Sequence, residues 1–181
     1  MTRVVLWVGG AGAVLAALLL LPLPWPVALV GGRLVDRIDI AAPPERVFAY
    51  ITAPANWPRW HPASRAVRGI TARTPQIGEQ VVETFEIAGR RAEATWTTVE
   101  LDPPRRWILT STAPGGGSAR LVYMLRGNDL GTVWERDLTY RGPNLLFGII
   151  NLVELRAVME ADSREALANV KRQLEALPSS P

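Results

Sequence analysis

The chain offers few side chains that could do chemistry, and His61 is the first of them. It is the only histidine. It lies in residues 56–62 (NWPRWHP), which hold no second imidazole and no carboxylate at ligand spacing. A zinc or iron site needs several such ligands together, and a general base needs a partner that orients it. We therefore predict no metal site and no catalytic residue, and we expect His61 to cap or pack within this aromatic segment.

Other reactive motifs are missing from the sequence. There is no cysteine, which excludes disulfides, thiol nucleophiles and cysteine metal sites and leaves the redox compartment open. Neither Ser111 nor Ser118 lies in a nucleophile-elbow pattern. Glycines 115–117 separate two predicted strands, so they indicate a hairpin rather than a phosphate cradle. The sequence therefore predicts no cofactor.

The charge pattern argues against one class of partner. The 181 residues carry a formal net charge of +3, with basic and acidic residues interleaved along the chain. Nucleic-acid-binding proteins concentrate basic residues in a patch or stripe. We therefore expect no nucleic-acid partner.

The N-terminal segment is strongly apolar. Residues 4–21 contain no charge, and as a helix they would reach about 27 Å, close to the hydrocarbon thickness of a bilayer. Prolines 22, 24 and 26 would end this helix near Trp25, a typical interfacial aromatic. A cleavable signal peptide is the alternative, but no small-x-small site follows the run. We predict a single-pass membrane anchor on a linker (residues 1–32), with the side of the membrane undecided, and one domain at 33–178.

The rest of the chain reads as strands followed by a long helix. Apolar residues alternate at 34–40, a short helix is predicted to begin after Pro43-Pro44, and an extended stretch follows at 64–70. Five consecutive strands at 79–88, 90–101, 105–112, 118–126 and 131–140 predict an antiparallel meander. In the last of them Arg136 shares a face with Trp134, Leu138 and Tyr140, which indicates an edge strand or a partly polar interior.

The predicted terminal helix, residues 143–177, has one clear apolar band and a second apolar surface in its front half. The band contains Leu145, Leu152, Leu155, Met159, Ala166, Val170, Leu174 and Leu177. The second surface consists of Leu146, Phe147, Ile150 and Val153. Three placements of this second surface are open: it lines a cavity mouth, touches a bilayer, or packs beneath the strand at 131–140.

Several of these segments together carry a family resemblance. They are the residues 42–48 (APPERVF), 56–62, 94–106 (ATWTTVELDPPRR), Gly131-Thr132 and the terminal helix. In this order they resemble the polyketide cyclase/dehydrase branch of the START-like, or SRPBCC (Bet v 1-like), superfamily. The resemblance implies an α+β helix-grip fold, in which a curved antiparallel sheet wraps around the C-terminal helix and two short helices close one end of an internal cavity.

Members of this superfamily bind lipids, sterols, quinones, polyketides or other apolar molecules, and only some act on them chemically. The resemblance therefore implies a protein that binds an apolar small molecule or lipid in its cavity. Together with the N-terminal segment, it leads us to expect a membrane-anchored binding protein. One alternative is an enzyme of the cyclase, aromatase or dehydratase type. Another is a structural partner in a membrane complex that docks through the second apolar surface.

Aromatic residues are the best candidates for the cavity wall, because the domain region holds most of the seven tryptophans. We expect the wall to contain Trp60, Phe85, Trp96, Trp107, Tyr123, Trp134, Ile149 and Leu152. Possible polar handles are Glu83, His61 and Arg156, although solvent-facing positions suit Glu83 and Arg156 as well. A buried Glu83 without a partner would have a raised pKa, which would give an enzyme its acid.

Overall fold

The computed structural model describes residues 16–17, 19–113 and 115–176, and its centre is one curved antiparallel sheet. The sheet is seven-stranded within these residues, with the order β1-β7-β6-β5-β4-β3-β2. Strands β2 to β7 each pair with their neighbours in sequence. Strand β1 forms the other edge of the sheet and pairs antiparallel with β7. The strands are β1 (Gly31–Ile40), β2 (Ser64–Gly69), β3 (Gln80–Ile87), β4 (Arg90–Asp102), β5 (Arg106–Ala113), β6 (Gly117–Asn128) and β7 (Gly131–Arg141).

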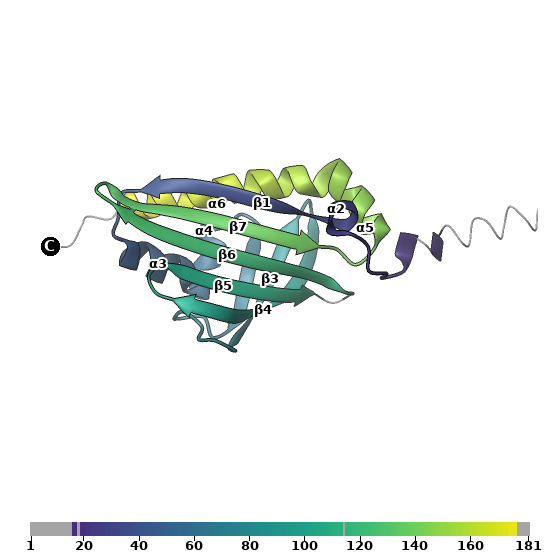
Figure 1. Cartoon of the computed structure of the whole chain (residues 1–181), viewed down its shortest axis with the longest axis horizontal. Coiled ribbons are helices and arrows are strands. Elements are labelled where there is room, and N and C mark those ends of the chain that lie inside the picture. The colour runs from purple at the N-terminus through teal and green to yellow at the C-terminus, as the bar shows by residue number, and fades with distance from the viewer. Residues whose placement is uncertain (1–15, 18, 114, 177–181) are drawn as a thin grey trace, which may run out of the picture.

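Short helices lie at the two ends of the sheet and one long helix runs between them (Figure 1). At one end are α3 (Pro44–Thr52), η1 (Pro54–Asn56) and α4 (Trp57–Trp60), and at the other is α2 (Val27–Val30) beside α5 (Leu145–Ile150). The chain then continues through a π-helical turn, η2 (Asn151–Leu155), into α6 (Arg156–Glu175), which lies along the sheet next to β1. This is the predicted α+β helix-grip arrangement.

The helix boundaries follow local sequence chemistry. Helix α3 begins at Pro44, with Glu45 in its first turn, because proline costs no hydrogen bond there and an acid suits the helix dipole. Helix α5 begins after Asn144, whose side chain accepts a hydrogen bond from the Phe147 amide at 2.9 Å. The predicted helix 143–177 therefore consists of α5, η2 and α6, which follow one another without a gap from Leu145 to Glu175. Leu177 lies outside the described residues.

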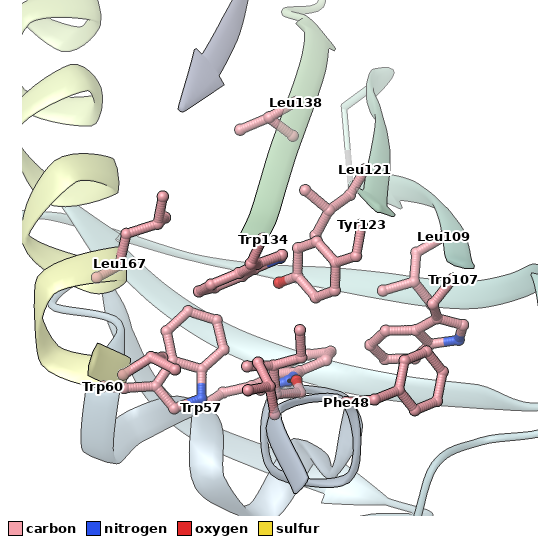
Figure 2. Close-up of a cluster of buried hydrophobic side chains, with 14 of the residues drawn as sticks. Phe48, Trp57, Trp60, Trp107, Leu109, Leu121, Tyr123, Trp134, Leu138 and Leu167 are labelled. Carbon is pink, nitrogen blue, oxygen red and sulfur yellow. Dashed lines mark hydrogen bonds between the residues drawn. The ribbon is translucent and has the colours of Figure 1, made fainter. Parts of the chain in front are cut away.

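The hydrophobic core fills the end of the sheet that α3 and α4 close. Figure 2 shows Trp134 and Tyr123 of the sheet facing Trp60 of α4, with Leu167 of α6 beside them. Trp134 makes edge-to-face contacts with Trp60 and Tyr123, at ring-centroid separations of 5.9 and 5.3 Å. Such pairs contribute about 0.5–1.5 kcal/mol beyond the burial of their surface.

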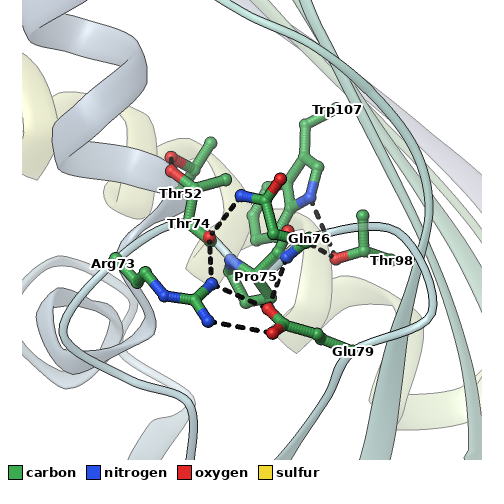
Figure 3. A network of polar contacts seen from close by, with 8 residues as sticks. All are labelled: Thr52, Arg73, Thr74, Pro75, Gln76, Glu79, Thr98 and Trp107. Atoms are coloured by element: carbon green, nitrogen blue, oxygen red, sulfur yellow. Dashed lines mark hydrogen bonds and ion pairs between the residues drawn. The ribbon is translucent and has the colours of Figure 1, made fainter.

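The loop between β2 and β3 is closed by a polar network (Figure 3). Arg73 donates two hydrogen bonds to the Glu79 carboxylate, at 2.7 and 2.9 Å, and the Gln76 amide donates a third at 2.6 Å. Thr98 then joins this loop to the core, since its hydroxyl donates to the Pro75 carbonyl and accepts from the Trp107 indole, both at 3.2 Å. The network therefore ties an exposed loop to a fully buried tryptophan.

The prediction of a single-pass anchor and a membrane location is contradicted, because no helix in the described residues is long and apolar enough to cross a membrane. Residues 4–15 and 18 of the predicted span lie outside the described residues. In the part that is described, the prolines leave residues 22–26 without helix, and α2 has only four residues. Arg141 and Asn144 donate hydrogen bonds to the carbonyls of Leu23 and Leu20, so this segment is bonded to the domain itself. The predicted boundary between residues 32 and 33 stays a prediction.

Candidate ligand cavity

A cavity of about 400 Å³ lies between the concave face of the sheet and the helices. Its volume falls within the range of small-molecule sites. The wall is mostly apolar and aromatic, and the lining residues of β3, β4 and β5 alternate along each strand, as the pleat requires. The side chains used below are Trp57, Trp60, His61, Glu83, Phe85, Trp96, Ser111, Tyr123, Arg136, Tyr140, Phe147 and Ile150.

Four of the eight residues expected in the wall line this cavity. They are Trp60, Phe85, Trp96 and Tyr123. Trp107 and Trp134 are fully buried, but they belong to the packed core beneath the cavity. Alternation along a strand identifies an inward-facing side chain, and it does not distinguish the core from the cavity.

Ile149 and Leu152 do not line the cavity, since their side chains are 51% and 82% exposed. The π-helical turn η2 explains this placement. A π turn takes about one residue more than an α turn, so it changes the phase of the apolar band between α5 and α6. Leu155 and Met159 reach the cavity after this shift, whereas Leu152 points outward.

The second apolar surface of the front half is divided between the cavity and the exterior. Phe147 and Ile150 line the cavity, while Leu146 and Val153 are 39% and 78% exposed. The exposed lining residues are Arg90 and Ala92 beside the β3–β4 hairpin and Ser118 beside the β5–β6 hairpin, which places the mouth there. Arg90 and Glu154 form an ion pair of 2.8 Å between that first hairpin and η2.

Of the three predicted polar handles, Glu83 and His61 line the cavity and Arg156 does not. Arg156 is exposed and pairs with Glu160 one helical turn away, at 2.9 Å. Glu83 accepts a hydrogen bond of 2.8 Å from the Trp96 indole. Burial raises the pKa of Glu83, while the neighbouring Ser64 and Trp96 and the charge of Arg136 act in the opposite direction.

Arg136 is a buried charged residue of the cavity that the sequence did not identify as a polar handle. It is 5% exposed, lies on the inner face of β7, which is not an edge strand, and lines the cavity. The signal was its position among Trp134, Leu138 and Tyr140, which indicated an edge strand or a partly polar interior. The second interpretation is the one that fits, because β7 pairs with β1 on one side and β6 on the other.

Arg136 is held by a chain of hydrogen bonds toward the helix side. Its Nη1 donates to Ser163 Oγ of α6 at 2.8 Å, and that hydroxyl donates to Asp36 Oδ2 of β1 at 2.5 Å. Its Nη2 lies 3.4 Å from His61 Nε2. Burial, followed by the charge of Arg136, lowers the pKa of His61 to about 3, so the imidazole is neutral at physiological pH.

Tyr123 is the cross-strand neighbour of Arg136. Burial raises the pKa of its hydroxyl to about 12, although Arg136 beside it acts in the opposite direction. The hydroxyl is therefore protonated and can donate a hydrogen bond at neutral pH. Glu83, His61, Tyr123 and Arg136 together form what we call the polar end of the cavity.

The described residues contain no group of three or more His, Asp or Glu side chains that could hold a metal ion. The polar end can instead donate hydrogen bonds, carry one positive charge and, through Glu83, exchange a proton. These are the abilities needed to orient a mostly apolar molecule by one polar group.

Comparison with known proteins identifies the family. Residues 32–175 match the family described as "Polyketide cyclase / dehydrase and lipid transport". The chain belongs to this family. A Mycobacterium tuberculosis protein named Toxin Rv0910 is 29% identical over 140 residues, which cover 76% of this chain and 94% of that protein.

Solved structures share the fold at low sequence identity. Protein CV1439 from Chromobacterium violaceum aligns with a TM-score of 0.63 and 16% identity, covering 81% of this chain and 99% of that one. DynU16, a protein in the dynemicin biosynthetic locus, aligns with a TM-score of 0.58 and 15% identity, covering 79% and 47%. The family and these structures fit an apolar ligand or a cyclase-type role, and the fold alone does not choose between them.

Proposed function

We propose that this protein binds an apolar small molecule in the internal cavity and orients it by the polar end. The observation that carries the proposal is the 400 Å³ cavity, with a mostly apolar wall and polar groups gathered at one end. Extra core packing would have filled this space, because protein interiors contain few voids larger than a water molecule. The family match supports the same ligand class.

Neighbouring residues of β5 provide a matched test. Ser111 is buried and lines the cavity, whereas Thr112 is exposed on the other face of the sheet. Ser111→Phe should fill the cavity and weaken binding of the fluorescent apolar probe N-phenyl-1-naphthylamine by about tenfold or more, since a ring occupies the ligand's space. Thr112→Phe should bind the probe like the wild type.

Extraction of the purified protein with organic solvent, followed by mass spectrometry, completes the test. The wild type and Thr112→Phe should carry the same apolar compound, and Ser111→Phe should carry less of it. Equal probe binding by the two variants, with nothing extractable from the wild type, would rule out the cavity as a ligand site.

A second candidate function, a cyclase or dehydratase type of enzyme, is favoured by one observation. Glu83 is a carboxyl with a raised pKa that lines the cavity near Tyr123 and Arg136. Such a group can transfer protons in dehydration. In this case Glu83→Gln should abolish water loss from a synthetic poly-β-keto thioester, measured by mass spectrometry, while probe binding persists. Unchanged turnover in this variant would exclude Glu83 as the acid.

A further inference from the structure

Several hydrogen-bond donors at and beside the polar end lack an acceptor within the described residues. The Tyr123 hydroxyl has no acceptor among the described residues, and its neighbour Arg136 is itself a donor. Arg136 Nε is also buried, and it has no hydrogen-bond partner among the described residues. The Trp60 indole N–H is likewise buried, and no described residue accepts a hydrogen bond from it. Buried donors left without acceptors are costly, so native proteins rarely keep several together.

His61 increases this imbalance. A neutral imidazole has only one acceptor nitrogen, yet two donors approach it. The Ala63 amide lies 3.2 Å from Nδ1, and Arg136 Nη2 lies 3.4 Å from Nε2. In either tautomer one ring nitrogen carries a proton and faces a donor. One more N–H group is therefore left without an acceptor at this end of the cavity.

The charges around Arg136 indicate which kind of acceptor would fit. No described carboxylate forms an ion pair with Arg136 directly. However, Asp36 lies one hydrogen bond beyond Ser163, and both Glu83 and Asp162 line the same cavity. The positive charge already has carboxyl groups on more than one side. A ligand anion buried beside Arg136 would therefore gain little binding free energy from its charge, and it would be repelled by these carboxyl groups.

We propose that the polar end recognises a neutral carbonyl oxygen, as in a ketone, ester or quinone, and binds it through the Tyr123 hydroxyl and the Arg136 guanidinium. A carbonyl oxygen supplies two lone pairs and no hydrogen, which is what a site with excess donors lacks. The apolar remainder of the ligand would then lie toward the mouth, against Phe147 and Ile150. This inference rests on the proposed function and adds the ligand's polar group and its orientation.

A set of naphthalene probes that differ only in their polar group tests the proposed carbonyl site. Isothermal titration calorimetry would compare 2-acetylnaphthalene with 2-ethylnaphthalene, 1-(2-naphthyl)ethanol and 2-naphthoate. The ketone should bind at least about tenfold tighter than the hydrocarbon, because a hydrogen bond from a charged donor is worth that much. The alcohol should bind more weakly than the ketone, since its own hydrogen needs an acceptor, and the carboxylate should bind more weakly as well.

Tyrosine variants separate recognition from folding. Tyr123→Phe removes only the hydroxyl and should lower the ratio of ketone to hydrocarbon affinity about fivefold or more. Tyr140→Phe is the matched control, because Tyr140 also lines the cavity but its hydroxyl already donates to Asn151 at 2.7 Å. The control should leave the ratio unchanged. Because the measured quantity is a ratio, a general loss of packing affects both probes alike.

The outcomes distinguish the two proposals. Equal binding of ketone and hydrocarbon to the wild type, or an unchanged ratio in Tyr123→Phe, would overturn the carbonyl site and leave the apolar cavity standing. Tighter binding of 2-naphthoate than of the ketone would show an anion site and also overturn it. Failure of every probe to bind would remove the ligand site altogether.

Discussion

Arg136 and His61 show how a charged residue is kept inside this domain. Moving a cation into a protein interior costs several kcal/mol unless hydrogen bonds replace its water. Ser163 of α6 accepts a hydrogen bond from Arg136 and itself donates to Asp36 of β1. Burial, followed by the charge of Arg136, keeps His61 neutral. The polar end therefore depends on residues far apart in the sequence.

The lowered pKa of His61 predicts acid sensitivity. The folded pKa is about 3, below the ordinary value near 6.5, so the unfolded chain binds the proton first as the pH falls. The contribution of His61 to the free energy of unfolding is fully present above about pH 6.5. It declines toward pH 3 by up to about 1.4 kcal/mol per pH unit. The raised pKa of Glu83 acts in the opposite direction, because protonation relieves a buried charge.

The comparison of wild type with His61→Gln checks this prediction. Between pH 7 and pH 5 the wild type should lose about 2 kcal/mol of unfolding free energy through this residue, measured by urea denaturation at both pH values. His61→Gln cannot titrate and should lose less over the same interval. Parallel losses in the two proteins would mean that the pKa of His61 is the same in the folded and unfolded states.

At the scale of elements, the junction of α5 and η2 decides which side chains reach the cavity. Gly148 allows α5 to approach α2 closely, because a Cβ at this position would lie 2.0 Å from the Leu29 carbonyl oxygen. The π turn that follows buries Asn151, whose side chain bonds Tyr140 and the Gly31 carbonyl. These contacts hold the start of the terminal helix against β1 and β7.

Gly148→Ala should therefore destabilise the protein. The added methyl group would push α5 away from α2 and cost about 1–3 kcal/mol, the usual range for overpacking. Urea denaturation would measure this loss. Ile149→Ala is the control, since Ile149 is 51% exposed and should change stability by less than about 1 kcal/mol. A fully stable Gly148→Ala would show that the close approach is not needed.

The loop between β2 and β3 predicts a second pH effect, of known direction. Hydrogen bonds from Arg73 and then from the Gln76 amide lower the pKa of Glu79 to about 2. A depressed carboxyl pKa stabilises the fold above about pH 4.5, and this contribution is lost as the pH falls toward 2. Glu79→Gln should be less stable than wild type at pH 7, with a smaller difference at pH 3.

Thermal unfolding at both pH values, with Glu165→Gln as an exposed control on α6, would measure this effect. The control should stay within about 0.5 kcal/mol of the wild type. A Glu79→Gln protein that matches the wild type at pH 7 would contradict the assigned role of the network.

At the scale of the whole molecule, the cavity is closed at one end of the sheet and opens at the other. Helices α3 and α4 pack on the core at the closed end, and the exposed lining residues of the mouth lie beside two hairpins near η2 and the start of α5. The ion pair of Arg90 and Glu154 joins both sides of this mouth at 2.8 Å. Because the pair is exposed, its effect is expected on ligand exchange rather than on the fold.

Glu154→Gln should speed ligand release by up to about fivefold, since an exposed ion pair contributes no more than about 1 kcal/mol. Stopped-flow dilution of a bound naphthalene ketone would measure the rate. The exchanged pair, Arg90→Glu with Glu154→Arg, should restore slow release. Equal release rates in all three proteins would show that the mouth opens without breaking this contact.

Local sequence determined most of the secondary structure. The predicted strands 90–101 and 131–140 appear as β4 and β7 with shifts of only one residue at one end, because alternation and glycine or proline breaks are local properties. The same alternation placed Trp134 and Arg136 on one face of their strand, which the structure shows as the buried face. The short helix after Pro43 followed from capping chemistry.

Only the tertiary structure decided how inward residues divide between core and cavity. Trp96 lines the cavity and Trp107 does not, although both point inward, because the curvature of the sheet and the helix positions set the free space. The π turn reversed the expectation for Leu152, and hydrogen bonds to the domain placed Leu20 and Leu23. His61 and Arg136, 75 residues apart, met only through the fold, since no local pattern encodes a contact at that separation.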